Sequence, residues 1–175
     1  MSEPPIPPAI AAMAAAAEAA RVRPVQDWHP THCGESHMRI LSNGAWLHEE
    51  RPITRPALVK LFASILRREG DGSYVVVTPG EKLTVAVDDA PFVAVELATE
   101  GEGAARRLAF RLNTEDIVVA GPGHRITIDR GRPYLDVRHG LSARIGRSVY
   151  YELAELALGE GAEGLHSDGV FFALA

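Results

Sequence analysis

The chain has 175 residues, of which 46% are hydrophobic and 23% charged, proportions typical of a soluble globular protein with its own core. Its 18 basic and 23 acidic residues are interspersed and leave a net charge of -5. This argues against a nucleic-acid partner, because phosphate binding depends on clustered Lys and Arg. Cys33 is the single cysteine, so we expect no intramolecular disulfide and a cytoplasmic location. No apolar run approaches the roughly 18 residues of a membrane helix.

The first 27 residues differ in composition from the rest of the chain. Four prolines within Glu3–Pro8 disfavour a helix, whereas the Ala-rich run Ala9–Ala20 favours one. The acidic start and Glu18 are unlike a secretory signal peptide, which needs a basic start and a strongly apolar centre. We therefore expect residues 1–27 to form an extended tail followed by a short helix.

A pattern of strand, turn, strand, helix and strand covers Met38 to Thr78. Asn43-Gly44 and Asp71-Gly72 supply the turns, because Gly adopts positive φ at little cost. The helix is predicted to begin at Thr54, whose hydroxyl can cap the first turn. Its apolar residues recur at helical spacing and are Leu58, Leu61, Phe62, Ile65 and Leu66. Arg67-Arg68 is expected at the helix C-terminus, where cations are favoured.

A strand-rich middle follows this first pattern. β-branched and aromatic residues dominate five short runs that are separated by turn residues, which predicts an antiparallel meander. The runs are Val75–Thr78, Leu83–Val87, Phe92–Leu97, Leu108–Leu112 and Ile117–Ala120. The middle of the chain is therefore expected to be rich in strands.

The order strand, turn, strand, helix and strand recurs near the end of the chain. Ile126 and Ile128 precede the turn Arg130-Gly131. A helix is predicted to begin at Ser142, in the position that Thr54 has in the first copy. Asp168-Gly169 then opens a last strand over Val170–Leu174, which matches Tyr74–Val77, and Gly159–Gly169 is interpreted as an inserted loop.

This internal repeat predicts an α+β fold of two lobes. Each lobe is expected to contain one copy of the strand-turn-strand-helix-strand motif, with antiparallel sheets and helices packed on one face. The first lobe, with the β-meander, is predicted over residues 28–112. The second is predicted over residues 113–175.

A set of residues spread over all but the N-terminal tail carries a resemblance to a known family. The set includes Trp28, Cys33-Gly34, Met38-Arg39-Ile40, Arg67, Asp71-Gly72, Asp88–Phe92 and Ala120-Gly121-Pro122. It resembles the bacterial "domain of unknown function 1285" family. The resemblance implies a two-domain α+β fold with a repeated motif, a bacterial cytoplasmic protein and a signalling or regulatory role, and it supplies no catalytic residues. Ser36 and His37 stand where the family usually has an apolar residue and an acid.

One segment is dense in residue types that bind metals: Asp27, His29, His32, Cys33, Glu35 and His37. Imidazoles and thiolates are zinc ligands, so one hypothesis is a metal-dependent hydrolase that uses the cluster from His29 to His37. The spacing lacks the second ligand pair, about 12 to 20 residues further on, of a structural zinc site. The alternative is a loop that leads into the first strand, with Cys33 buried and Trp28 in packing. We favour the loop and expect no metal and no cofactor.

The remaining polar residues favour binding over catalysis. The chain has no nucleophile elbow and no Gly-rich phosphate loop that ends in Lys-Ser/Thr. Arg55 opens the first predicted helix, and Glu81 and Lys82 follow the adjacent strand, so these three are the candidate ligand-binding residues at the rim of a groove between the lobes. We interpret the chain as a non-catalytic regulatory or signal-transduction protein that binds a small ligand or a protein partner there. The metal-dependent hydrolase is the alternative.

Overall fold

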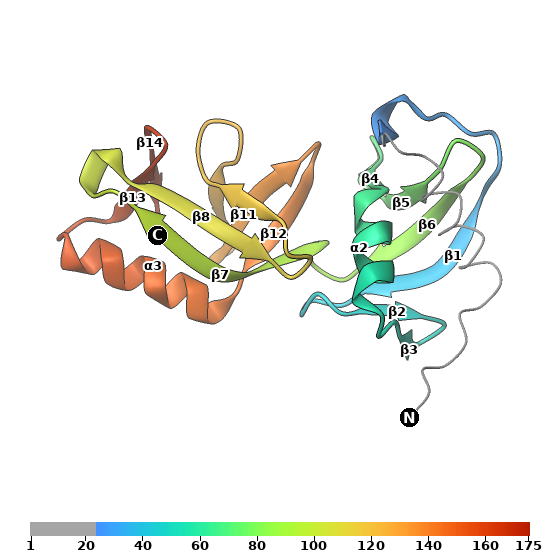
Figure 1. The fold of residues 1–175 in the computed structure, drawn as a ribbon, viewed down its shortest axis with the longest axis horizontal. Helices are drawn as coiled ribbons and strands as arrows, with labels where there is room; N and C mark the ends of the chain where they lie inside the picture. Colours follow the sequence, from blue (N-terminus) through green and yellow to red (C-terminus); the bar gives the residue numbers. More distant parts are fainter. Residues whose placement is uncertain (1–23) are drawn as a thin grey trace. The chain divides into compact units, whose positions relative to one another are not determined.

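The computed structural model describes residues 24–175, which divide into two compact units (Figure 1). The first unit comprises residues 24–41 and Ala45–Val87, and the second comprises Ser42–Gly44 and Asp88–Ala175. Of the predicted N-terminal zone, residues 1–23 lie outside the described part, and Val25–Asp27 form a short 3-10 helix, η1. Both units are mostly β with few helices, so the two-lobed architecture is as predicted and the α+β class holds in its coarse form.

The first unit contains a six-stranded sheet in the order β3-β2-β1-β6-β5-β4. Its strands are β1 (Cys33–Ile40), β2 (Trp46–His48), β3 (Arg51–Pro52), β4 (Leu66–Arg68), β5 (Tyr74–Val77) and β6 (Lys82–Val87). β1 and β6 run parallel, whereas the other pairs are antiparallel. The expectation of a purely antiparallel sheet is wrong, because β6 turns back from β5 and thereby runs in the direction of β1.

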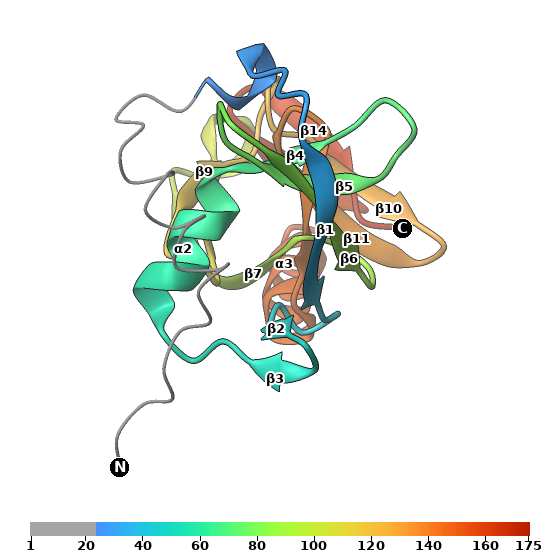
Figure 2. The same ribbon diagram turned by 90° about the vertical axis from the view of Figure 1, so that its right-hand side faces the viewer.

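Helix α2 (Pro56–Ser64) lies against one face of this sheet (Figure 2). The Trp46 ring on β2 stacks on the Phe62 ring of α2, with ring centroids 6.2 Å apart. Both side chains are almost fully buried, as are Ile40 of β1 and Val76 of β5. The core of the first unit therefore lies between α2 and the middle strands. This agrees with the alternation of apolar residues along those strands in the sequence.

The second unit contains another six-stranded sheet, in the order β10-β11-β12-β7-β8-β9. Its strands are β7 (Phe92–Glu100), β8 (Arg107–Leu112), β9 (Ile117–Val119), β10 (Ile126–Asp129), β11 (Arg132–Arg138) and β12 (Leu141–Ile145). β7 pairs with β12 in parallel and with β8 in an antiparallel ladder. These pairings place residues 92–112 in the second unit, so the boundary falls near residue 88 and not near 112.

Helix α3 (Arg147–Gly159) and the hairpin of β13 (Gly164–Ser167) and β14 (Val170–Ala173) complete the second unit. The helix contacts β7 and β13. Ser167 is fully buried, and its hydroxyl donates to the Ala120 carbonyl (2.7 Å) and accepts from the Leu108 amide (2.8 Å). The predicted last strand is confirmed. Gly159–Gly169 is more than the predicted loop, because it includes β13.

Both helices begin later than predicted. Arg55 and not Thr54 is the N-cap of α2, and Gly146 is the N-cap of α3. Ser142 lies in β12, where it pairs with Asp136 of β11. The first helix also ends early, because Ile65 leaves helical geometry (φ -109°, ψ 9°) and the chain continues as β4. Apolar residues at 65 and 66 suit a helix stripe and a buried strand equally, and the pairing of β4 with β5 decides between them.

The two units share an order of elements but differ in how the strands pair. Each has three antiparallel strands, then a helix, then a hairpin: β1-β2-β3, α2 and β4-β5 in the first unit, and β10-β11-β12, α3 and β13-β14 in the second. In the first unit the hairpin joins the main sheet through β6. In the second unit β13 and β14 form a sheet of their own.

Candidate functional site

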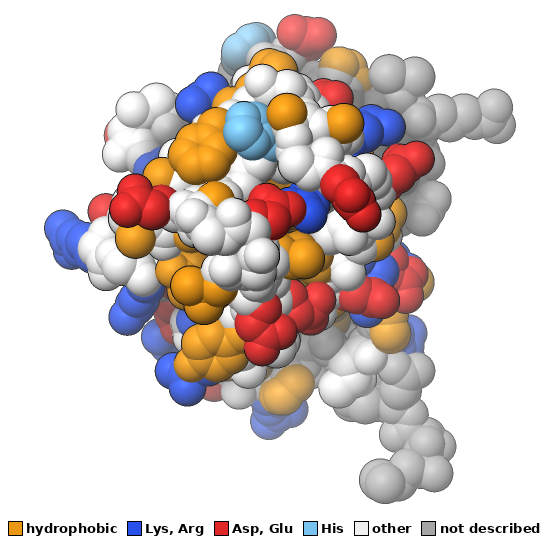
Figure 3. Space-filling view, turned by 90° about the vertical axis from the view of Figure 1, so that its left-hand side faces the viewer, with side chains coloured by type: hydrophobic (Ala, Val, Ile, Leu, Met, Phe, Trp, Pro, Cys, Tyr) orange, Lys and Arg blue, Asp and Glu red, His pale blue; other side chains and the backbone are white. Residues whose placement is uncertain are grey.

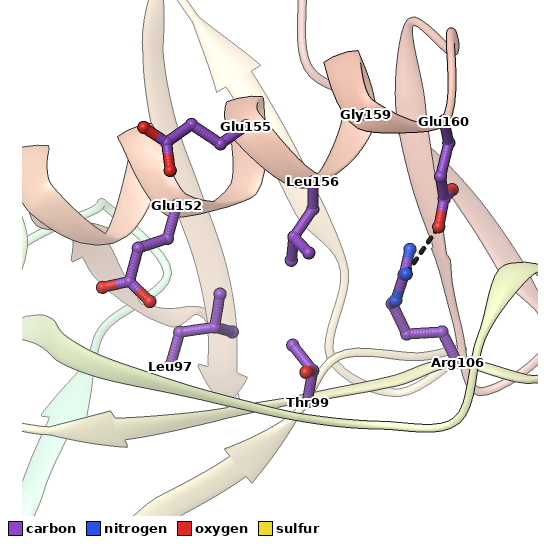
Figure 4. A pocket seen from close by; sticks show the side chains of 8 residues that line it. All are labelled: Leu97, Thr99, Arg106, Glu152, Glu155, Leu156, Gly159 and Glu160. Carbon is purple, nitrogen blue, oxygen red and sulfur yellow. Dashed lines mark ion pairs between the residues drawn. The ribbon is translucent and has the colours of Figure 1, made fainter.

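A pocket opens between α3 and β7 in the second unit (Figure 4). We call it the Arg106 pocket; its lining residues are Leu97, Thr99, Arg106, Glu152, Glu155, Leu156, Gly159 and Glu160. Its volume is about 520 Å³, within the range of small-molecule sites. All lining residues belong to one compact unit, so the second unit alone builds the pocket.

Arg106 is the buried charge of this pocket. It follows the short 3-10 helix η2 (Gly103–Ala105), and its amide donates to the Gly103 carbonyl (3.2 Å). Its carbonyl accepts from the Asp168 amide (3.1 Å) at the turn of the last hairpin. Its side chain rises toward Glu160, and the Nη2 to Glu160 Oε1 distance is 2.5 Å (Figure 4). The backbone of Arg106 is thus held on both sides, and the ion pair with Glu160 orients the guanidinium.

Two nitrogens of this guanidinium have no partner. Arg106 is only 7% exposed, yet among the described residues its Nε and Nη1 atoms have no hydrogen-bond acceptor. Buried N–H groups are almost always hydrogen-bonded, because leaving them unpaired loses their interaction with water. Both atoms also have almost no accessible surface, so they lie within the wall of the pocket and not at its surface.

Three carboxylates line the pocket on the side of α3. Glu152 and Glu155 lie three residues apart on α3, which places them next to each other on the helix surface, and Glu160 is the C-cap of the helix. Glu160 pairs with Arg106, whereas Glu152 and Glu155 form no ion pair with any described residue. Figure 3 views the second unit from the end of α3 and shows acidic side chains gathered beside hydrophobic ones. The pocket thus combines a buried donor with an acidic rim.

The wall opposite the helix is largely uncharged. Leu97 and Thr99 lie two residues apart on β7, so both side chains point from the same face of the strand. Leu156 reaches down from α3 toward them (Figure 4). The two leucines give the pocket an apolar middle between Arg106 and the more distant carboxylates.

The residues that the sequence singled out for binding all lie in the first unit. Arg55 is the N-cap of α2, Lys82 is the first residue of β6, and Glu81 directly precedes that strand. Lys82 Nζ lies 3.0 Å from Glu69 Oε1, and Glu81 Oε2 lies 3.9 Å from His32 Nε2. Lys82 is therefore engaged in an ion pair within its own sheet.

Glu69 also accepts from Arg67 Nη2 at 3.0 Å. Arg67 is 5% exposed, and its Nη1 donates to the carbonyls of Val25 (2.6 Å) and Trp28 (2.7 Å). Burial on its own raises the pKa of Glu69, but the hydrogen bonds and charges of Arg67 and Lys82 outweigh it, so the pKa is lowered. This group holds η1 against β4 and is part of the fold.

The histidine-rich segment is spread along β1 and the loop before it. His32 approaches Glu81, and His37 Nδ1 lies 3.9 Å from Glu35, each with well over half of the imidazole exposed. Residues 24–175 contain no group of three or more His, Cys, Asp or Glu that could hold a metal ion. Cys33 was expected to be buried but is exposed, because it is the first residue of β1 and the first three residues of this strand are exposed.

Ser36 and His37 form a bulge in β1. The pairing register with β6 shifts between Glu35 and Met38, and His37 adopts a positive φ of 58°. The buried Ser36 hydroxyl donates to the Thr84 carbonyl (2.6 Å) and accepts from the Met38 amide (3.0 Å). Ser36 thereby satisfies backbone groups that the bulge leaves out of the ladder.

A second polar group lies in the second unit. The Tyr134 hydroxyl donates to Asp89 Oδ1 (2.7 Å), and Arg144 Nε lies 4.0 Å from Asp89 Oδ2. Burial, and then the bond to Asp89, raise the pKa of Tyr134, so its hydroxyl stays protonated and acts as a donor.

The sequence analysis missed Arg106. This residue follows the turn residues 100–105, and no motif in its neighbourhood indicates that it is buried. The helix and hairpin that bury it come more than 40 residues later.

The fold and the pocket define a mostly β protein of two units, with a pocket of small-molecule size in the second. The chain matches two family models: "Domain of unknown function (DUF1285), N-terminal domain" over residues 23–90, and "Protein of unknown function (DUF1285), C-terminal domain" over residues 91–174. It belongs to the DUF1285 family. The boundary between the two models falls in the loop between β6 and β7, where the two structural units also divide.

Two solved structures are similar to this chain. A DUF1285 family protein from Silicibacter pomeroyi DSS-3 is 41% identical, with a TM-score of 0.81 and 93% of each chain covered. A DUF1285 family protein from Shewanella baltica OS155 is 26% identical, with a TM-score of 0.56, and the match covers 67% of this chain and 90% of that one. None of the curated proteins matches the chain. Within residues 24–175, no helix is both long and apolar enough to cross a membrane.

Proposed function

We propose that this protein is a non-catalytic regulatory or signal-transduction protein of the bacterial cytoplasm, and that it acts by binding a small ligand in the Arg106 pocket. The observation that carries the proposal is the pocket between α3 and β7, which has a volume of about 520 Å³ and holds the Arg106–Glu160 ion pair and two leucines in its wall.

The dimensions of the pocket favour a small ligand. Its volume of about 520 Å³ exceeds a single amino-acid side chain and suits a metabolite. Leu97 and Leu156 provide the apolar surface that such sites use for affinity, and Arg106 provides orientation. A protein partner, and a groove between the two lobes with Arg55, Glu81 and Lys82 at its rim, stay predictions from the sequence.

The proposal is tested by measuring ligand-induced stabilisation. A panel of carboxylates, phosphates, amines and amino acids is screened against the full chain by thermal shift, because a ligand that binds only the folded state raises Tm. The Arg106→Lys variant keeps the charge but loses the planar fork, so at least a tenfold loss of affinity is expected. Arg107→Lys, at a half-exposed neighbour, is the control.

Two results contradict the proposal. One is a ligand whose affinity does not change in Arg106→Lys. The other is chemical conversion of the bound ligand at a rate that Arg106→Lys abolishes, since this makes the pocket an active site and the protein an enzyme.

A further inference from the structure

We propose that the outer face of α3 is a docking surface for a basic amphipathic helix of a protein partner. We call this surface the α3 ridge; it consists of Tyr151, Glu155 and Leu158, with Glu152 beside them. The inference goes beyond the proposed function, because Tyr151 and Leu158 do not line the Arg106 pocket.

Tyr151 and Leu158 give the α3 ridge its apolar surface. Their side chains are 58% and 77% exposed, and Leu158 is the most exposed large hydrophobic residue of the described chain. They are seven residues apart, which brings them to the same side of the helix at about 10 Å from each other along its axis. The buried residues of the helix, Val149, Leu153 and Ala157, lie on its opposite side. The core of the second unit therefore leaves the ridge uncovered.

Charge determines which kind of partner fits the ridge. Glu155 lies between the two apolar residues, four positions after Tyr151 and three before Leu158, and Glu152 lies one turn before Glu155. Neither carboxylate forms an ion pair with any described residue. A helix that covers Tyr151 and Leu158 also removes water from these carboxylates, which costs free energy unless a cation takes the place of the water. Lys or Arg side chains beside the apolar stripe of the partner supply that cation.

The carboxylate of Glu155 disfavours a second copy of this chain as the occupant. If two copies pack their α3 ridges in parallel, each Glu155 faces the Glu155 of the other copy. If they pack antiparallel, with Tyr151 of each copy on Leu158 of the other, the two Glu155 side chains again meet near the centre, because the midpoint of the ridge lies between residues 154 and 155. Both arrangements bring like charges together in a contact that excludes water.

The spacing of the ridge specifies the apolar stripe of the partner. Apolar residues at positions i, i+3 or i+4, and i+7 of a helix span the same length as the ridge, about 10 Å. Arg147, the first residue of α3, is the one basic residue of this helix, and the acidic side chains lie further along it. The basic residues of the partner are therefore expected beside Glu152 and Glu155.

Fluorescence anisotropy on the full chain tests the proposal with two labelled synthetic helices of about 15 residues. Both peptides carry leucines at positions i, i+4 and i+7; one has Lys at the flanking positions and the other has Glu. We expect the Lys peptide to bind about tenfold more tightly than the Glu peptide. Its affinity should fall as salt is added, because the charges lie at the surface.

Substitutions then locate the bound peptide. Leu158→Ala is expected to weaken binding of the Lys peptide by about fivefold, whereas Ile117→Ala, at a side chain that is 62% exposed on β9, is the matched control and should change nothing. Glu155→Gln is expected to weaken the Lys peptide but not the Glu peptide, and Glu49→Gln, at an exposed position in the first unit, is its control. Unfolding of Leu158→Ala at the urea concentration of the wild type shows that the fold is kept.

Four outcomes contradict the proposal. The first is a Lys peptide that does not bind, or binds no more tightly than the Glu peptide. The second is an equal effect of Leu158→Ala and Ile117→Ala. The third is a wild-type dimer in sedimentation velocity that Leu158→Ala dissociates, since the occupant is then a second copy. The fourth is a peptide that Arg106→Lys releases and Leu158→Ala retains, since it binds in the Arg106 pocket and not on the ridge.

Discussion

Arg67 shows how a charged side chain can be buried in the first unit. Its guanidinium donates to the carbonyls of Val25 and Trp28, and Glu69 balances its charge. The two carbonyls lie in and next to η1, which places the N-terminal end of the described chain against β4. An arginine that the sequence placed at a helix end is therefore a bridge between two segments about 40 residues apart.

The first prediction concerns Glu69 and acid stability. Its pKa is lowered in the folded protein, so its contribution is present above the ordinary value of 4.5 and is lost as the pH falls through the folded-state pKa. We expect Glu69→Gln to lower the free energy of unfolding by about 1 to 2 kcal/mol at pH 7. The difference from wild type should shrink below pH 4.5. Urea denaturation at a series of pH values measures both.

Glu81→Gln is the control for this prediction. Glu81 directly precedes β6, and its Oε2 lies 3.9 Å from Nε2 of His32, whose side chain is well exposed. The substitution is expected to change stability by less than about 0.5 kcal/mol. Equal losses in the two variants would show that the Arg67–Glu69–Lys82 group has no special role.

The second prediction concerns Tyr134 and alkaline stability. Its pKa is raised, so its contribution is present below the ordinary value of 10 and is lost as the pH rises through the folded-state pKa. Tyr134→Phe removes the 2.7 Å bond to Asp89 and is expected to cost about 1.5 to 3 kcal/mol at pH 7. Guanidinium titrations at pH 7 and above pH 10 should show a smaller alkaline loss in the variant. An equal alkaline loss would argue against this assignment.

Among the elements, the C-terminal hairpin depends on one face of β14. Phe172 is 3% exposed, whereas Phe171 is 48% exposed and its ring lies 5.1 Å from that of His166. Leu174 is also buried, and its carbonyl accepts from the Tyr150 hydroxyl on α3 (2.7 Å). Alternation along the strand therefore divides two neighbouring aromatic residues between the core and the surface.

The third prediction uses these neighbours as a matched pair. Phe172→Ala is expected to lower the free energy of unfolding by about 3 to 5 kcal/mol because it empties a buried site. Phe171→Ala should cost less than about 1 kcal/mol, since half of its side chain is already in water. Thermal and urea unfolding of both variants provide the measurement. Similar losses of stability in the two variants would contradict the assignment of Phe172 to the core and Phe171 to the surface.

Local chemistry made the turns and strands predictable. Gly72 and Gly169 have φ values of 89° and 81° in the two hairpin turns, as their Asp-Gly sequences indicated. The runs of β-branched residues form strands, as their β propensity indicated. The first residues of the helices were harder, since Thr54 and Ser142 are good caps by type but only pairing with β11 shows that Ser142 belongs to a strand.

Long-range contacts made the rest unpredictable. The parallel pairs join residues far apart, such as Ile40 with Val87 and Ile145 with Ala94, and no local pattern specifies such partners. The same holds for the pocket: Arg106 is defined by Glu160 and by the turn at Asp168. Arg55, Glu81 and Lys82 were chosen by local position, which carries no information on burial or unpaired donors.

At the scale of the whole molecule, each unit has a large core of its own. Trp46, Phe62 and Ile65 are fully or almost fully buried in the first, and Phe92 and Phe110 are fully buried in the second. The Arg106 pocket lies within the second unit, so its geometry depends on β7, α3 and the C-terminal hairpin. The second unit can therefore be tested separately for folding.

The last prediction compares two fragments of the second unit. Fragment 88–175 keeps the whole six-stranded sheet, although it omits Ser42–Gly44, and should unfold cooperatively in urea. Fragment 113–175 begins at the boundary that the sequence suggested and lacks β7 and β8. It loses four large side chains that are 0% exposed: Phe92, Leu108, Phe110 and Leu112. At about 2 to 5 kcal/mol each, their combined loss is as large as the roughly 5 to 15 kcal/mol that stabilises a whole domain.

Fragment 113–175 also lacks β7, which pairs with β12 and contacts α3. The Ser167 hydroxyl loses the Leu108 amide, so the hairpin loses part of its attachment to the sheet. Far-UV circular dichroism and amide proton dispersion should therefore report a folded 88–175 and an unfolded 113–175. A folded 113–175 would mean that β10-β11-β12, α3 and the last hairpin form an independent core, as the repeat alone predicted.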